Sequence, residues 1–201
     1  MTAVHLGFEG LVGYGQSAPL TTYDGFTFDN MGAVNKYWGF VNGYGNNNGF
    51  YTVAHYHTAA YTAETIPGHT EGTISSTTEF TLRSGMFASV WQAGGEEVKF
   101  TAMRNGVAVG NMKVDLTITP QEIVFNHHFK DIDAVVITAT SGTGNDSNVS
   151  MDRLKFLIPD SSGSHADPAT VASAHAAIGD THLDDSLSAL HLGALHHDWA
   201  L

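Results

Sequence analysis

The 201-residue sequence contains no cysteine, few charged residues and no long apolar run. Without cysteine, a disulfide scaffold, a thiolate nucleophile and a cysteine-ligated zinc site are all excluded. No apolar stretch approaches the roughly 18 residues of a membrane-spanning helix, so we expect no membrane span. The first ten residues also lack the basic and apolar regions that mark a secretory signal peptide.

Charged residues make up only 14% of the chain, and 8 basic residues against 20 acidic ones give a formal net charge of −12. An acidic chain without a basic patch repels phosphate groups, which argues against nucleic-acid binding. The hydrophobic content of 42% is sufficient for a packed core. Together with the 22 glycines it favours strands joined by turns over a helical bundle.

The distribution of charge divides the chain near residue 160. All eight lysines and arginines lie between Lys36 and Lys155, whereas the tail carries six aspartates and half of the 12 histidines. Residues 159–164 have the composition of a linker. We therefore predict a β domain over 1–158 and an acidic, His-containing helical tail over 165–201.

The first unit has the pattern of antiparallel strands. Apolar residues alternate with polar ones between Thr78 and Phe129, and Asn105-Gly106 is a strong hairpin signal because a type I′ turn needs two residues with positive φ. Strands at this spacing without a convincing helix between them indicate a sandwich or barrel. The predicted fold is all-β, an antiparallel jelly-roll β-sandwich with a short C-terminal α-helical tail.

The region from Pro19 to Thr73 is rich in aromatic residues, glycine and asparagine, which is typical of binding loops. Aromatic faces and amide groups together suit sugars, so we predict a carbohydrate site at Tyr37, Trp38, Tyr44, Asn46, Asn47 and Asn48. The alternative is a Gly/Asn turn that joins two strands. We expect Phe26, Phe28, Phe40 and Phe50 to lie in the core.

Residues 1–158 resemble bacterial secreted jelly-roll domains known from exported proteins with PEP-CTERM sorting tails, which are similar to galactose-binding-like sandwiches. The resemblance rests on short motifs: Leu6–Leu11, Tyr23–Asn30, Gly39–Gly43, Phe80–Trp91 and Met151–Phe156. The sequence departs from this family in two places. It lacks the sorting tail, and Arg153 stands where the family usually has a second aspartate.

The resemblance implies a calcium ion between the first and last strands. Calcium takes carboxylate and carbonyl oxygens, and the candidate ligands are Glu9 and Asp152, with Asp24 and Asp29 as further candidates. The alternative is a solvated rim at which Asp152 pairs with Arg153 or Lys155.

A transition-metal site is a weaker prediction. His55 and His57 would share one face of a strand, and His69 would follow after a turn. Scattered surface histidines are the alternative, and exposed histidine and tyrosine would also suit a haem carrier.

The last four residues, Asp198, Trp199, Ala200 and Leu201, resemble the uncleaved C-terminal signal of type I secretion substrates. This resemblance implies export by type I secretion machinery and a bacterial, extracellular or cell-surface location. The alternative is an ordinary C-terminal helix that docks on the sandwich.

No sequence pattern of a catalytic site is present. There is no Gly-x-Ser-x-Gly elbow, no His-Glu-x-x-His and no phosphate-binding glycine loop. We therefore expect a secreted, non-enzymatic module that binds a polysaccharide or cell-surface glycan. A self-assembling matrix, surface-layer or filament protein, as in a biofilm, is the second interpretation because low charge and free sheet edges favour association into polymers.

Overall fold

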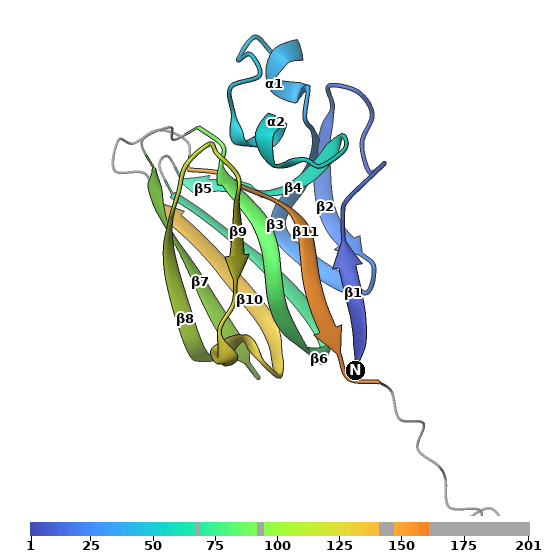
Figure 1. Cartoon of the computed structure of the whole chain (residues 1–201), viewed down its shortest axis with the longest axis vertical. Helices are drawn as coiled ribbons and strands as arrows, with labels where there is room; N and C mark the ends of the chain where they lie inside the picture. The colour runs from blue at the N-terminus through green and yellow to red at the C-terminus, as the bar shows by residue number, and fades with distance from the viewer. Residues whose placement is uncertain (67–68, 92–94, 141–146, 161–201) are drawn as a thin grey trace, which may run out of the picture. The chain divides into compact units, whose positions relative to one another are not determined.

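The computed structural model describes residues 1–66, 69–91, 95–140 and 147–160. The predicted linker from residue 161 onward, the helical tail and the secretion signal at 198–201 therefore lie outside the described residues. Within the described part the structure is an antiparallel β-sandwich of jelly-roll type, as predicted (Figure 1). No helix in these ranges is long and apolar enough to cross a membrane.

Eleven strands and three short helical segments make up the described chain. The strands are β1 (Thr2–Leu6), β2 (Ser17–Tyr23), β3 (Phe26–Asn35), β4 (Thr58–Thr62), β5 (Glu64–Ile66), β6 (His69–Ser89), β7 (Glu96–Arg104), β8 (Val107–Leu116), β9 (Gln121–Val124), β10 (Ile132–Thr140) and β11 (Val149–Ile158). The helical segments are α1 (Trp38–Val41), α2 (Gly49–Val53) and the 3-10 turn η1 (His127–Phe129).

The long strand β6 connects the two layers. Its first half pairs with β3, β5 and β10, and its second half pairs with β9 and β11. One layer continues through β10 to β7 and β8, and the other continues from β11 to β1. Strand β4 pairs with both β3 and β11 and so closes the sandwich at one side.

Two predictions of local structure are confirmed. The first and last strands, β1 and β11, pair from Thr2 opposite Ile158 to Leu6 opposite Leu154. Asn105 and Gly106 have φ values of 50° and 75° and connect β7 to β8 in a hairpin. Two residues with positive φ match the right-handed twist of the flanking strands.

The prediction of binding loops from Pro19 to Thr73 is wrong for most of that region, which contains β2 to β5 and two short helices. Residues 31–35 of β3 are all buried, so the alternation that marks a half-buried strand is missing. Phe26, Phe28 and Phe50 lie in the core as expected, whereas Phe40 is 59% exposed on α1.

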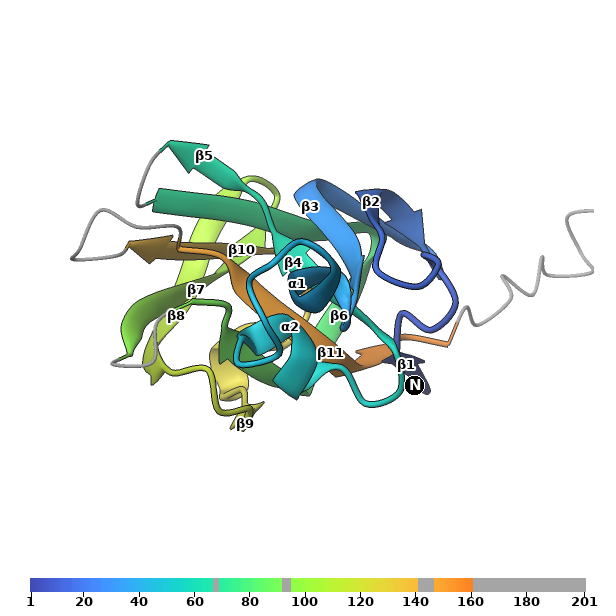
Figure 2. The same ribbon diagram turned by 90° about the horizontal axis from the view of Figure 1, so that it is seen from above.

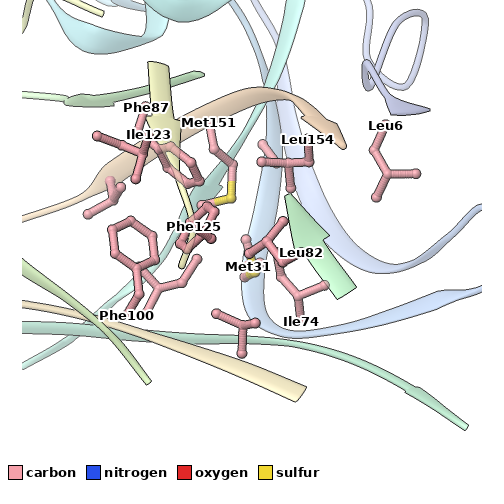
Figure 3. Packing of buried hydrophobic residues seen from close by; sticks show 14 of the residues in the cluster. Leu6, Met31, Ile74, Leu82, Phe87, Phe100, Ile123, Phe125, Met151 and Leu154 are labelled. Atoms are coloured by element: carbon pink, nitrogen blue, oxygen red, sulfur yellow. The ribbon is translucent and has the colours of Figure 1, made fainter. Parts of the chain in front are cut away.

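The main core fills the space between the layers. Phe87 of β6, Phe100 of β7 and Phe125 pack edge to face with ring centroids 5.0–6.0 Å apart (Figure 3). Met151 and Leu154 of β11 pack in the same cluster, as do Leu6 and Met31. Burial of these side chains stabilises the sandwich and fixes the positions of the strand ends.

A second, smaller core lies beneath the two helices. Phe50 and Val53 of α2 pack against Val34, Ala88 and Val90, with Trp38 and Trp91 at its margin. The helices cover one end of the sandwich, as the view from above shows (Figure 2). The candidate functional residues gather around this end.

Candidate functional site

The segment that carries the predicted carbohydrate residues is held by a helix cap. Asn48 is fully buried, accepts a hydrogen bond from the Tyr51 backbone N–H at 3.1 Å and donates to the Gly45 carbonyl at 2.9 Å. The Thr52 hydroxyl donates to the Ile118 carbonyl at 2.6 Å and ties α2 to the sandwich. Asn48 is therefore an N-cap residue, while Asn46 and Asn47 are exposed beside it.

A groove runs over β3 between its neighbours β2 and β4. Pro19, Gly32 and Tyr61 lie opposite one another in the register of these three strands. Because Gly32 has no side chain, the Tyr61 ring lies over it, and beside this ring is a hollow of about 390 Å³ whose lining includes Pro19, Asp29, Asn30 and Tyr61. A Cβ on residue 32 would come within 2.4 Å of the Tyr61 ring.

The groove continues towards the helices. A second cavity of about 110 Å³ shares Ser17 and Tyr61 with the first and is lined further by Trp38, Trp91 and Asn148. We call the two connected hollows the Tyr61 groove. Burial raises the pKa of Tyr61, and a hydrogen bond with Ser17 acts in the opposite direction.

Three aromatic rings meet at the helix end of the Tyr61 groove. Trp38 and Tyr44 stack with centroids 5.7 Å apart and planes 8° apart, and the Tyr44 ring lies 5.2 Å from that of Trp91. Tyr44 is 62% exposed and is the outermost of the three. The Trp91 Nε1–H donates to Asn148 Oδ1 at 3.3 Å, and Asn148 Nδ2 donates to the Thr62 carbonyl, so the indole has a fixed orientation.

Tyr37 belongs to a different surface from its neighbour Trp38. Its ring centroid lies 5.0 Å from that of Tyr14 and 5.9 Å from that of Tyr51, and Lys36 Nζ lies 5.4 Å from the Tyr37 centroid. The six predicted carbohydrate residues thus divide among three environments: the groove, the Tyr14–Tyr37 surface and the helix cap.

Glu9 and Asp152 bind the same stretch of backbone. Asp152 accepts hydrogen bonds of 2.7 Å from the N–H groups of His55 and Arg153, and Glu9 accepts bonds of 3.3 Å from those of Tyr56 and His57. Burial raises the pKa of Asp152 to about 6; the two backbone hydrogen bonds lower it, and the nearby Glu9 carboxylate raises it further.

The calcium site stays a prediction. The two carboxylates are brought together, but in the described ranges no three His, Asp or Glu side chains form a metal cluster, so the remaining ligands would be backbone carbonyls or water. Asp24 has a φ of 48° in the β2–β3 turn, and Asp29 lines the Tyr61 groove. Of the two residues predicted to pair with Asp152, Arg153 contacts it through its backbone N–H, whereas Lys155 Nζ contacts Glu122 instead.

The histidines differ from expectation. His55 and His57 lie in a bend before β4 rather than on a strand, and both are exposed. His69 is the first residue of β6, and its side chain is outside the described set. The transition-metal site therefore stays a prediction without support from the geometry.

Sequence reasoning missed Tyr61 and Trp91 as site residues. Tyr61 faces the groove because of its register with Gly32, which is a non-local property of the sheet. Trp91 lies two residues after the end of β6, and the sequence pattern does not mark this position as part of a site.

No protein-family model and no curated protein match the chain. Several solved structures are similar to it. The K1 cleaved adhesin domain of Lys-gingipain from Porphyromonas gingivalis W83 has a TM-score of 0.45 at 9% identity, covering 78% of this chain and 98% of that one.

Two carbohydrate-binding modules are also similar. The CBM22-1 xylan-binding domain of Paenibacillus barcinonensis Xyn10C has a TM-score of 0.44 at 13% identity and covers 77% of this chain and 92% of that one. TmCBM61, solved in complex with beta-1,4-galactotriose, has a TM-score of 0.39 at 10% identity and covers 69% and 91%. At these levels of similarity we base the function on the residues of the site.

Proposed function

We propose that the protein is a non-enzymatic carbohydrate-binding module and that the Tyr61 groove holds a polysaccharide chain. The observation that carries this proposal is the hollow beside Tyr61, which shares Ser17 and Tyr61 with the pocket lined by Trp38 and Trp91. Two neighbouring hollows that share lining residues suit a polymer rather than a compact small molecule.

The chemistry of the lining supports a sugar ligand. Aromatic rings pack against the C–H faces of sugars, and Ser17, Asn30 and Asn148 supply hydroxyl and amide groups beside them. Among the side chains that the structure describes, Asp29 is the only charged one in the lining of the two hollows. With a net charge of −12 on the chain, an uncharged polysaccharide is favoured over an anionic one.

The proposal includes the location of the protein. A module that binds polysaccharide works at the cell surface or outside the cell, and the C-terminal resemblance to type I secretion signals supplies a route of export. Calcium at Glu9 and Asp152 would stabilise the module without taking part in binding at the Tyr61 groove.

Affinity gel electrophoresis tests the proposal. The native chain is run through gels that contain xylan, galactan, β-glucan or, as an anionic polymer, polygalacturonate. We expect retardation by a neutral polysaccharide and loss of that retardation in Tyr61→Ala. The matched control is Tyr56→Ala, which removes a 60% exposed tyrosine that lines neither hollow of the groove. Equal retardation of both variants, or none of the native chain, would refute it.

Self-assembly is a second candidate function with one supporting observation. Strand β8 stands at the end of the strand order, and Val107 and Val109 on it are 63% and 39% exposed. An apolar sheet edge can pair with a second copy, although Lys113 on the same strand disfavours such pairing. Light scattering of the native chain and of Val109→Lys distinguishes self-assembly from polysaccharide binding. Assemblies that form in the native chain but not in Val109→Lys would favour self-assembly.

A further inference from the structure

A separate hollow of about 310 Å³ lies where β3, β4 and the segment after β1 meet. Its lining includes Glu9, Tyr14, Asn35, Tyr37 and Thr58, and it shares no lining residue with the Tyr61 groove. A hollow of this size suits one small ligand. The polar groups in the hollow indicate the chemical class of that ligand.

Thr58 and Asn35 form the buried polar floor. They lie directly opposite each other in the β3–β4 register, so their side chains are on the same face of the sheet. Thr58 is 1% exposed, and its Oγ1 has no hydrogen-bond partner in the part of the chain that the structure describes. A buried hydroxyl without a partner destabilises a protein, so its presence here points to a partner that a ligand supplies.

Asn35 offers donors at the same place. It is 5% exposed, and its Oδ1 accepts hydrogen bonds of 3.1 Å from the backbone N–H groups of Gly15 and Tyr37. Both described hydrogen bonds of the side chain therefore use Oδ1, and the Nδ2 donors remain for a ligand. Holding Oδ1 in this way also fixes the direction in which Nδ2 points.

Glu9 and Tyr14 complete the hollow. The Glu9 carboxylate accepts only long backbone hydrogen bonds of 3.3 Å and has further lone pairs for ligand hydroxyls. Tyr14 is 66% exposed and packs on one side against Tyr37, which leaves apolar ring surface open towards the hollow.

We propose that this hollow is a second binding site that takes a single neutral sugar unit. A fixed amide donor, a buried hydroxyl and a carboxylate acceptor match the hydroxyls of a sugar ring, and the tyrosine matches its C–H face. The Glu9 carboxylate disfavours uronic acids because two negative charges would meet in one small hollow. The inference does not depend on the Tyr61 groove, because the two sites have different residues.

Isothermal titration calorimetry of the native chain with galactose, glucose, mannose, xylose and glucuronate tests the proposal. We expect at least one neutral monosaccharide to bind and glucuronate to bind more weakly. Thr58→Val, which keeps the shape but removes the hydroxyl, should weaken that binding about fivefold. Tyr14→Ala should weaken it as well, whereas Tyr56→Ala and Tyr61→Ala should leave it unchanged.

Thr58→Val also separates a ligand site from a plain packing defect. If the Thr58 hydroxyl is only an unsatisfied group, this variant raises the unfolding temperature and leaves sugar binding as it was, which would overturn the proposal. Failure of every neutral monosaccharide to bind the native chain would overturn it too. Loss of binding in Tyr61→Ala instead of Tyr14→Ala would assign the sugar to the groove and overturn the second site.

Discussion

The ring of Tyr61 lies over Gly32 on the adjacent strand, so close that a Cβ at residue 32 would come within 2.4 Å of the ring. This contact sets the position of the Tyr61 ring, which is one of the aromatic walls of the groove. Gly32 does not need a special backbone conformation, since its φ is not positive. The absence of its side chain is what the position of the Tyr61 ring requires.

Gly32→Ala should therefore displace the Tyr61 ring and so change the shape of the Tyr61 groove. We expect the free energy of unfolding to fall by about 1–2 kcal/mol, because a methyl group is forced into an occupied space. Retardation by the polysaccharide that retards the native chain should be lost. Urea unfolding and affinity gels measure the two effects, and a variant that is retarded like the native chain would show that the Tyr61 groove does not bind the polysaccharide.

Asn48→Ala tests the division between cap and ligand residues. The substitution removes the N-cap of α2 and leaves buried backbone groups without a partner, so we expect a loss of about 1–2 kcal/mol in stability. Asn46→Ala and Asn47→Ala, at exposed positions, should change stability by less than about 0.5 kcal/mol. Equal stability of all three variants in urea would contradict the assignment of Asn48 as the N-cap of α2.

Glu96 gives the stability a pH dependence. Burial raises the pKa of Glu96 to about 7, and a side-chain hydrogen bond with Ser89 acts in the opposite direction. The folded chain therefore binds the proton of the Glu96 carboxyl group more tightly than the unfolded chain does. The stabilisation is complete below the unfolded pKa of 4.5 and is lost as the pH rises through about 7. Glu96→Gln should be more stable than the native chain by about 2 kcal/mol at pH 8 and similar to it at pH 4.

The control for this experiment is Glu97→Gln. Glu97 is exposed and pairs with Lys113 at the surface, so its substitution should change stability by less than about 1 kcal/mol at either pH. Denaturant unfolding at the two pH values measures both variants. An unchanged pH dependence in Glu96→Gln would show that this carboxyl is not the group responsible.

The predicted calcium site has a thermodynamic test. If calcium binds Glu9 and Asp152, then at about 100 times its Kd it should stabilise the fold by about 2.7 kcal/mol. Asp152→Asn should abolish this gain, whereas Asp24→Asn, in the β2–β3 turn, should retain it. If calorimetric scans of the native chain coincide in calcium and in EDTA, the prediction of a calcium site is wrong.

The sequence predicts the fold class, the β7–β8 hairpin and the pairing of β1 with β11 because these depend on local patterns and on a common topology. It does not predict β3 as a strand, since burial on both faces removes the alternation over residues 31–35. The pairs Gly32–Tyr61 and Asn35–Thr58 depend on the register between β3 and β4. Register is set by the packing of the whole sheet, so neither candidate site is visible before the strands are paired.

The carbohydrate-binding role of Trp38 and Tyr44 stays a prediction, and the contact of Tyr44 with Trp91 was not predicted. Trp91 follows β6, about 50 residues further along the chain, and Asn148, which orients its indole, precedes β11. A site assembled from three such distant segments has no spacing that a single sequence can reveal.

Tryptophan fluorescence tests the central claim most directly, because Trp38 and Trp91 line the groove and the third tryptophan, Trp199, lies outside the described residues. An oligosaccharide of the retarding polysaccharide is titrated into Trp199→Phe, so that both remaining indoles report on the groove. The account predicts a saturable change in emission that is absent in Trp199→Phe combined with Tyr61→Ala. Binding by calorimetry without any change in emission would contradict a groove bounded by these indoles.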